Sequence, residues 1–165
     1  MAVKLFQIEE PDGGPSDPNL PGMAIAIDLS GAAALVAVSV GGNAAMLDDR
    51  AGFEQDLLVP GGDAGPAQWE ELFLGARLRA ERALARPATH AVIATIAAPG
   101  PVLAARLTAA AGLAGLDVLR LVAVGDLRLG GDLPSDAAPV LAAAMLAEDL
   151  APPPEPGQPP GTNLA

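Results

Sequence analysis

The chain has 165 residues, 51% of them hydrophobic, a formal net charge of −11 and no cysteine. This length fits one domain with a sizeable core. The acidic balance argues against nucleic acid and anionic membrane surfaces, which both require a basic face. The lack of cysteine excludes disulfides, thiol nucleophiles and cysteine-ligated metals or clusters. Because the start also lacks a signal-peptide pattern, we expect a cytoplasmic protein.

Both ends of the chain differ in composition from its middle. Residues 1–21 open with the sequence Leu5-Phe6-Gln7-Ile8-Glu9-Glu10-Pro11 and continue in glycine, proline, aspartate and serine. We expect a mostly flexible arm, in which Leu5, Phe6 and Ile8 dock as a short extended segment. Residues 22–150 form the domain. Residues 151–165 hold six prolines and are expected to be a disordered tail.

The stretch from Met23 to Val40 anchors the interpretation. Two apolar runs flank the small-residue turn Ser30-Gly31-Ala32-Ala33, and Asp28 lies inside the first run. These polar and small residues favour two strands over one membrane span. An unpaired carboxylate in an apolar setting costs several kcal/mol, so Asp28 needs a water-exposed strand end, a function or a local partner. We expect that partner to be a backbone donor in the Ser30 turn or a helix end.

The remaining elements follow from hydrophobic periodicity and turn residues. In chain order, we predict strands at Ile25–Leu29, Leu35–Val40 and Ala44–Leu47, a brief pairing of Leu57–Val59, a helix at Trp69–Ala85, a strand at His90–Ile96, a helix at Val102–Leu113, a strand at Asp117–Val124, a short strand at Leu127–Leu129, and a last helix capped by Ser135 or Asp136 and ending near Leu150. This order predicts an α/β domain of ribonuclease-H-like pattern. We expect one lobe, with a mixed sheet of about five strands and flanking helices.

Several side chains in this part of the chain receive structural interpretations. Acidic Glu70 and Glu71 are assigned to the first turn of the helix at Trp69–Ala85. Trp69 is predicted to be a packing anchor, and His90, the only histidine, an edge residue of its strand. The arginines toward the end of the helix are expected to form a solvated face. They are Arg77, Arg79, Arg82 and Arg86.

Three stretches match the pattern of one known family. Leu5–Pro11 looks like the start Leu-x-Gln-Ile-x-Glu-Pro, and Ala26–Ala37 looks like the phosphate loop Gly-Ile-Asp-Leu-Gly-Thr-Thr-Asn-Ser-Leu-Val-Ala. Ala91–Leu121 follows, without a gap, a strand followed by a Leu-Ala-Gly-Leu-x-Val-Leu-Arg-Leu run. The chain thus resembles the heat-shock-protein-70 chaperones, and among them the HscA branch that serves iron–sulfur assembly. The resemblance implies an actin-like ATPase lobe, with Asp28, Ser30 and Gly31 in the first phosphate loop.

The chain also departs from that family where the nucleotide chemistry is done. Gly31 and Ala32 stand in place of the phosphate-binding threonines, and the only lysine is Lys4. The second phosphate loop is missing, and we expect neither a second lobe nor a peptide-binding domain. Nucleotide hydrolysis needs donors and a metal held from both walls of a cleft. We therefore predict no ATPase activity, no cofactor and no bound metal, and a vestigial loop at Asp28, Ser30 and Gly31.

These departures predict a non-catalytic pseudo-chaperone remnant that acts as a protein-binding or accessory module, linked to chaperone or iron–sulfur assembly. Its alanine-rich binding surface is expected around residues 30–34 and 123–129. The alternatives are a structural accessory subunit of a larger complex and a weak nucleotide-binding protein. A ribonuclease-H-like nuclease is a further alternative, since Asp28 ends the first strand. It would need converging carboxylates, for which Glu70, Glu71 and Glu81 are the candidates.

Overall fold

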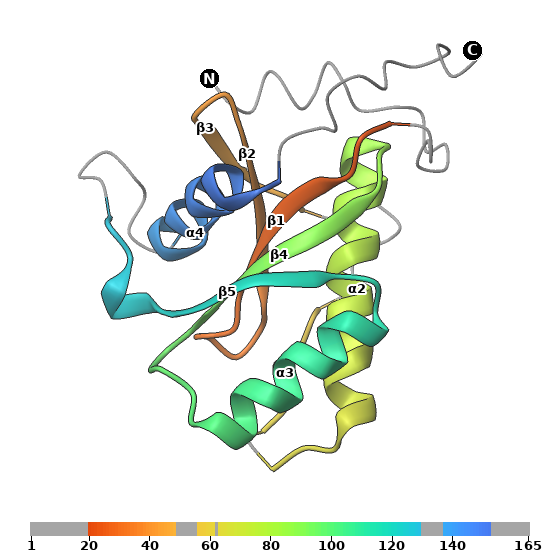
Figure 1. Ribbon diagram of the computed structural model, residues 1–165, viewed down its shortest axis with the longest axis vertical. Helices are drawn as coiled ribbons and strands as arrows, with labels where there is room; N and C mark the ends of the chain where they lie inside the picture. Colours follow the sequence, from red (N-terminus) through yellow and green to blue (C-terminus); the bar gives the residue numbers. More distant parts are fainter. Residues whose placement is uncertain (1–19, 49–55, 62, 130–136, 153–165) are drawn as a thin grey trace.

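The computed structural model describes residues 20–48, 56–61, 63–129 and 137–152, which form an α/β domain around one mixed sheet (Figure 1). The elements in chain order are β1 (Met23–Asp28), β2 (Leu35–Val40), β3 (Asn43–Met46), α2 (Pro66–Leu84), β4 (Ala88–Thr95), α3 (Pro101–Leu113), β5 (Asp117–Ala123), η1 (Val124–Asp126) and α4 (Ala138–Leu150). Nearly all of the predicted arm and tail lies outside the described residues. No helix in the described ranges is long and apolar enough to cross a membrane.

The sheet has five strands in the order β3-β2-β1-β4-β5. β1, β2 and β3 form an antiparallel meander, and β4 and β5 run parallel to β1. Gly41 and Gly42 join β2 to β3 with φ of 61° and 82°, the left-handed conformation that a tight hairpin turn requires. The predicted mixed sheet with flanking helices is thereby confirmed.

Residue size alternates along β1, and this alternation separates two unequal cores. Ile25 and Ile27 face the core beneath α2 and α3, whereas Ala24 and Ala26 face α4. α4 presents its own small buried residues in return, among them Ala143. Small side chains on both surfaces let the helix approach the strands closely, while the large aliphatic side chains fill the opposite layer. Figure 1 shows α2 and α3 on one face of the sheet and α4 alone on the other.

α2 begins three residues before the predicted start at Trp69. Pro66 occupies the first turn, and Gly65 and Gln68 exchange hydrogen bonds, with the Gly65 N–H donating to Gln68 Oε1 at 3.2 Å. The assignment of Glu70 and Glu71 to the first turn was therefore wrong. Trp69 is buried and stacks on Phe73 with 6.4 Å between ring centroids, which confirms its packing role.

The arginines in α2 and just after it do not form the expected solvated face. Arg77 donates from Nη1 to the Ala114 carbonyl at 2.8 Å, and its Nε lies 3.3 Å from Glu81 Oε2. Arg86 donates from Nη2 to the Pro21 carbonyl at 3.0 Å. These contacts tie α2 to the end of α3 and to the segment before β1. Arg79 and Arg82 are also half-buried and have partners.

Three smaller expectations need correction. Residues 127–129 form no strand, because the chain turns through η1 directly after β5. His90 lies on an inner strand, since β4 runs between β1 and β5. α4 has Ala137 at its N-cap with no side-chain cap hydrogen bond. The proposed caps Ser135 and Asp136 lie outside the described residues.

Gly115 is predicted to be intolerant of any side chain. Its φ of 92° strains every other residue type, and an added Cβ would meet Arg77 Nη1. Gly115→Ala should lower the free energy of unfolding by about 1–2 kcal/mol in urea titrations. Gly112→Ala is the matched control, because Gly112 is helical with open space around it, and it should raise stability by up to about 1 kcal/mol. Equal effects of the two substitutions would contradict this account of the α3 terminus.

Glu148 fastens the end of α4 to the β2–β3 hairpin. Its Oε1 accepts hydrogen bonds from Ser39 Oγ and from the Gly42 N–H, both at 2.9 Å, and its Oε2 accepts from the Gly41 N–H. Burial raises the pKa of Glu148, but the bonds from Gly42, Ser39 and Gly41 outweigh it and hold the pKa below its ordinary value. The charged form is therefore the one that stabilises the fold.

Acidification should remove this stabilisation. The contribution of Glu148 is present above the ordinary carboxyl pKa of 4.5 and is lost as the pH falls through the lower pKa of the folded state. Glu148→Gln should cost about 1 kcal/mol at neutral pH and flatten the pH dependence of stability in the acid range. Urea unfolding at a series of pH values measures both effects. Glu71→Gln, which changes an exposed acid of α2, is the control, and an unchanged pH slope in Glu148→Gln would contradict the prediction.

Candidate functional site

The carboxyl ends of three parallel strands meet at one edge of the sheet. Asp28 ends β1 and pairs with Ala94 of β4, and Thr95 ends β4 and pairs with Ala123 at the end of β5. In open α/β sheets, ligands bind outside this edge, because the loops that follow the strands converge there. A binding or catalytic site is therefore expected first at this edge.

Asp28 is satisfied within its own turn. The residue is 4% exposed, and its Oδ1 accepts a hydrogen bond from the Ser30 N–H at 2.9 Å. This is an Asx turn, in which a side-chain oxygen takes the place of a backbone acceptor. The prediction that Asp28 finds a backbone donor in the Ser30 turn is confirmed.

The residues after Asp28 are held by neighbouring backbone. The Ala34 N–H donates to the Leu57 carbonyl at 2.7 Å, and the Val59 N–H donates to the Ala32 carbonyl at 2.9 Å. Ala33 forms an isolated antiparallel bridge with Leu58, which confirms the predicted brief pairing of Leu57–Val59. The turn is thus fixed on both sides, and its backbone donors at Ala34 and Val59 are already used.

The neighbouring polar side chain, Thr95, is also committed. It is buried, and its hydroxyl donates to the Ala97 carbonyl at 2.7 Å with a longer contact of 3.5 Å to the Val122 carbonyl. Among the described residues, no three histidine, aspartate or glutamate side chains are grouped so that they could hold a metal ion. Glu81, a carboxylate considered for a nuclease, accepts the Ala88 N–H at 3.0 Å at the start of β4, opposite to Asp28.

The exposed side chains that follow β1 and β4 at this edge are small or apolar. Ile96 is 77% exposed directly after β4, Val102 is 72% exposed at the start of α3, and Leu58 is 68% exposed beside the Ala33 bridge. Exposed small residues lie in the same loops. We call this set the carboxyl-end face: Gly31, Ala32, Leu58, Ile96, Ala97, Ala98 and Val102.

Sequence reasoning located only part of the carboxyl-end face. The stretch 30–34 was expected to be exposed, and Gly31 and Ala32 are, although Ala34 is buried. Ile96 was instead assigned to the end of the strand His90–Ile96, whereas β4 ends at Thr95. A large aliphatic residue between the last buried residue of a strand and a Pro-Gly-Pro turn was the signal for its exposure.

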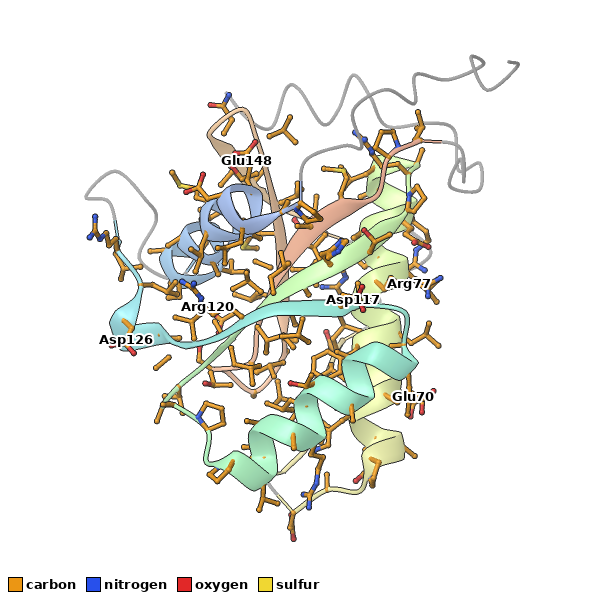
Figure 2. The ribbon with its side chains drawn as sticks, viewed as in Figure 1. Glu70, Arg77, Asp117, Arg120, Asp126 and Glu148 are labelled. Carbon is orange, nitrogen blue, oxygen red and sulfur yellow. The ribbon has the colours of Figure 1, made fainter. Side chains whose placement is uncertain are left out.

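A second feature lies on the face of the sheet that carries α4. Here a pocket of about 640 Å³ opens between β5, η1 and α4, and we call it the β5–α4 pocket. Its apolar lining includes Val122, Leu127, Met145 and Leu146. Its charged lining is Arg120, Asp126, Arg128 and Asp149. Figure 2 shows Arg120 between β5 and α4 and Asp126 at η1. The expected alanine-rich surface around residues 123–129 is therefore a charged and apolar pocket wall.

No family model matches the chain, and no curated protein matches it.

Substitutions at Asp28 should separate the need for an acceptor from the need for a charge. Asp28→Ala removes the acceptor of the Ser30 N–H and should lower the free energy of unfolding by about 1–2 kcal/mol. Asp28→Asn keeps an oxygen at that position and should lie within about 0.5 kcal/mol of wild type. Urea unfolding at neutral pH measures both. If Asp28→Asn is as destabilising as Asp28→Ala, the negative charge has a role beyond the turn.

Proposed function

We propose that the chain is a non-catalytic, protein-binding module that retains one heat-shock-protein-70-like lobe and binds its partner through the carboxyl-end face. The observation that carries the proposal is the chemical character of this edge. The polar side chains that end β1 and β4 are bonded within the chain, while the large residues that point to solvent are apolar.

Two features support a ribonuclease-H-like, actin-like lobe. The sheet order β3-β2-β1-β4-β5, with β2 antiparallel to its neighbours, is the arrangement expected for such a lobe. Asp28 ends β1 and is followed by a turn, where the resemblance to the chaperone family places the first phosphate loop. Fold alone does not assign a function, so the proposal rests on the residues of the edge.

The residues of that turn favour binding over hydrolysis. Phosphate transfer depends on donors and a metal that stabilise charge on the transferred group. At the positions of the family's threonines, the chain has Gly31 and Ala32, which are exposed and carry no hydroxyl. The Asp28 carboxylate is occupied by the Ser30 N–H. The competing hypothesis is that Asp28, Ser30 and Gly31 still bind a nucleotide weakly.

The charges around the carboxyl-end face indicate the chemistry of the partner. Single exposed apolar residues are ordinary on a surface, but several at one edge of a sheet form the centre of a typical interface. Among the described residues, the exposed charges next to Leu58 are the acids Asp56 and Asp63, while the segment after β5 carries both Asp126 and Arg128. A complementary partner therefore presents an apolar centre, with basic residues on the side that meets Asp56 and Asp63. The resemblance of Leu5–Pro11 to the HscA start suggests chaperone or iron–sulfur assembly proteins as the first candidates.

A substitution within this face tests the proposal against a matched substitution outside it. Ile96→Asp places a charge in the centre of the proposed interface. Leu113→Asp changes a similarly exposed leucine, 69% exposed against 77% for Ile96, at the end of α3. Quantitative affinity purification should recover a partner with wild type and with Leu113→Asp, and lose it at least tenfold with Ile96→Asp. Equal recovery with all three proteins would contradict the assignment of the face. A stable stoichiometric complex insensitive to Ile96→Asp would favour the structural-subunit alternative.

A further inference from the structure

β5 is only partly covered on the face of the sheet that carries α4. α4 packs against β1, β2, β3 and β4, whereas β5 packs against α3 on the opposite face. None of the seven residues of β5 is fully buried, in contrast to the buried centres of β1 and β4. The β5–α4 pocket lies in this strip, where a second element would complete the layer.

The β5–α4 pocket is lined by arginine side chains that have no bonding partner among the described residues. Arg77, Arg86 and Arg106 donate to backbone carbonyls, and Arg79 and Arg82 have partners of their own. Within the described ranges, Arg120 and Arg128 have neither a hydrogen bond nor an ion pair, and both line the pocket. In a chain of net charge −11, two unpaired guanidinium groups beside apolar side chains indicate an occupant with both apolar and acidic residues.

We propose that the occupant is the segment Val3–Glu10 of the same chain. This segment lies outside the described residues, and its composition complements the pocket. Val3, Leu5, Phe6 and Ile8 supply apolar side chains, and Glu9 and Glu10 follow them directly. Lys4, the only lysine, stands beside them as a counterpart for the two acids of the pocket wall.

The segment Val3–Glu10 would make three kinds of contact with the pocket. The apolar side chains cover Val122, Leu127 and Met145, Glu9 and Glu10 meet Arg120 and Arg128, and Lys4 meets Asp126 or Asp149. Burial of the apolar groups supplies most of the binding free energy, while the charges fix the register.

The connection is long enough for this contact. Residues 11–19 join the segment to Leu20, where the described chain begins. These nine residues span up to about 30 Å when extended, about twice the radius of gyration of a domain of this size. A tether of this length gives an effective concentration in the millimolar range, so a modest intrinsic affinity suffices.

A spin label can locate the segment in the full chain. Because the protein has no cysteine, Ala2→Cys creates a single attachment site. We expect the attached nitroxide to broaden the amide NMR signals of Val122, Leu127 and Met145 at least twofold relative to the reduced label. Signals on the outer surface of α2, such as that of Glu71, should be unaffected.

Variants and mixtures decide between the possible outcomes. Leu5→Ser with Phe6→Ser, and separately Arg120→Ser with Arg128→Ser, should abolish the broadening, whereas Leu113→Ser should leave it unchanged. Dispersed amide spectra verify that each variant is folded. No broadening at the pocket, or uniform broadening over the surface, overturns the proposal. Broadening of an isotope-labelled molecule by the nitroxide of an unlabelled one identifies a second copy as the source of the segment and overturns the intramolecular form.

Discussion

The hydrogen bond between the Ser30 N–H and the Asp28 carboxylate sets the character of the edge where a ligand would be expected. A buried carboxylate must be hydrogen-bonded, and here the donor comes from the turn that Asp28 itself begins. The backbone of Leu57–Val59 fixes the other side of the turn. The Asp28 carboxylate and the N–H groups of Ser30 and Ala34 are therefore engaged within the fold, and the exposed positions of the turn, Gly31 and Ala32, carry no polar side chain.

The second constraint is the alternation of isoleucine with alanine along β1. It produces a thick layer beneath α2 and α3 and a close-packed one beneath α4, and Glu148 holds α4 over the hairpin. A single helix on that face leaves β5 partly uncovered. The carboxyl-end face and the β5–α4 pocket thus have different origins. The first follows from the composition of the strand ends, and the second from a missing element in one layer.

The sequence predicted the elements better than their surroundings. Hydrophobic periodicity and turn residues located every strand of the sheet and the three α-helices that pack on it. Ile25, Ile27 and Trp69, for example, each lie in a regular pattern. The helix start at Pro66 was missed because proline and glycine were taken as loop signals, although proline is also favoured in a first helical turn. Arg77 was misjudged because its acceptor, the Ala114 carbonyl, is distant in sequence. Likewise, the pocket depends on how α4 sits against β5, which no local pattern encodes. The kinship with the chaperone family stays a prediction.

Isothermal titration calorimetry with ATP and magnesium tests the central claim most directly. If Asp28 serves only its own turn and the strand ends form a protein-binding face, titration of the full chain should give no binding heat at concentrations up to millimolar. Saturable binding at micromolar concentration with one site per chain, lost in Asp28→Asn, would contradict the account. It would show that the turn still holds a nucleotide.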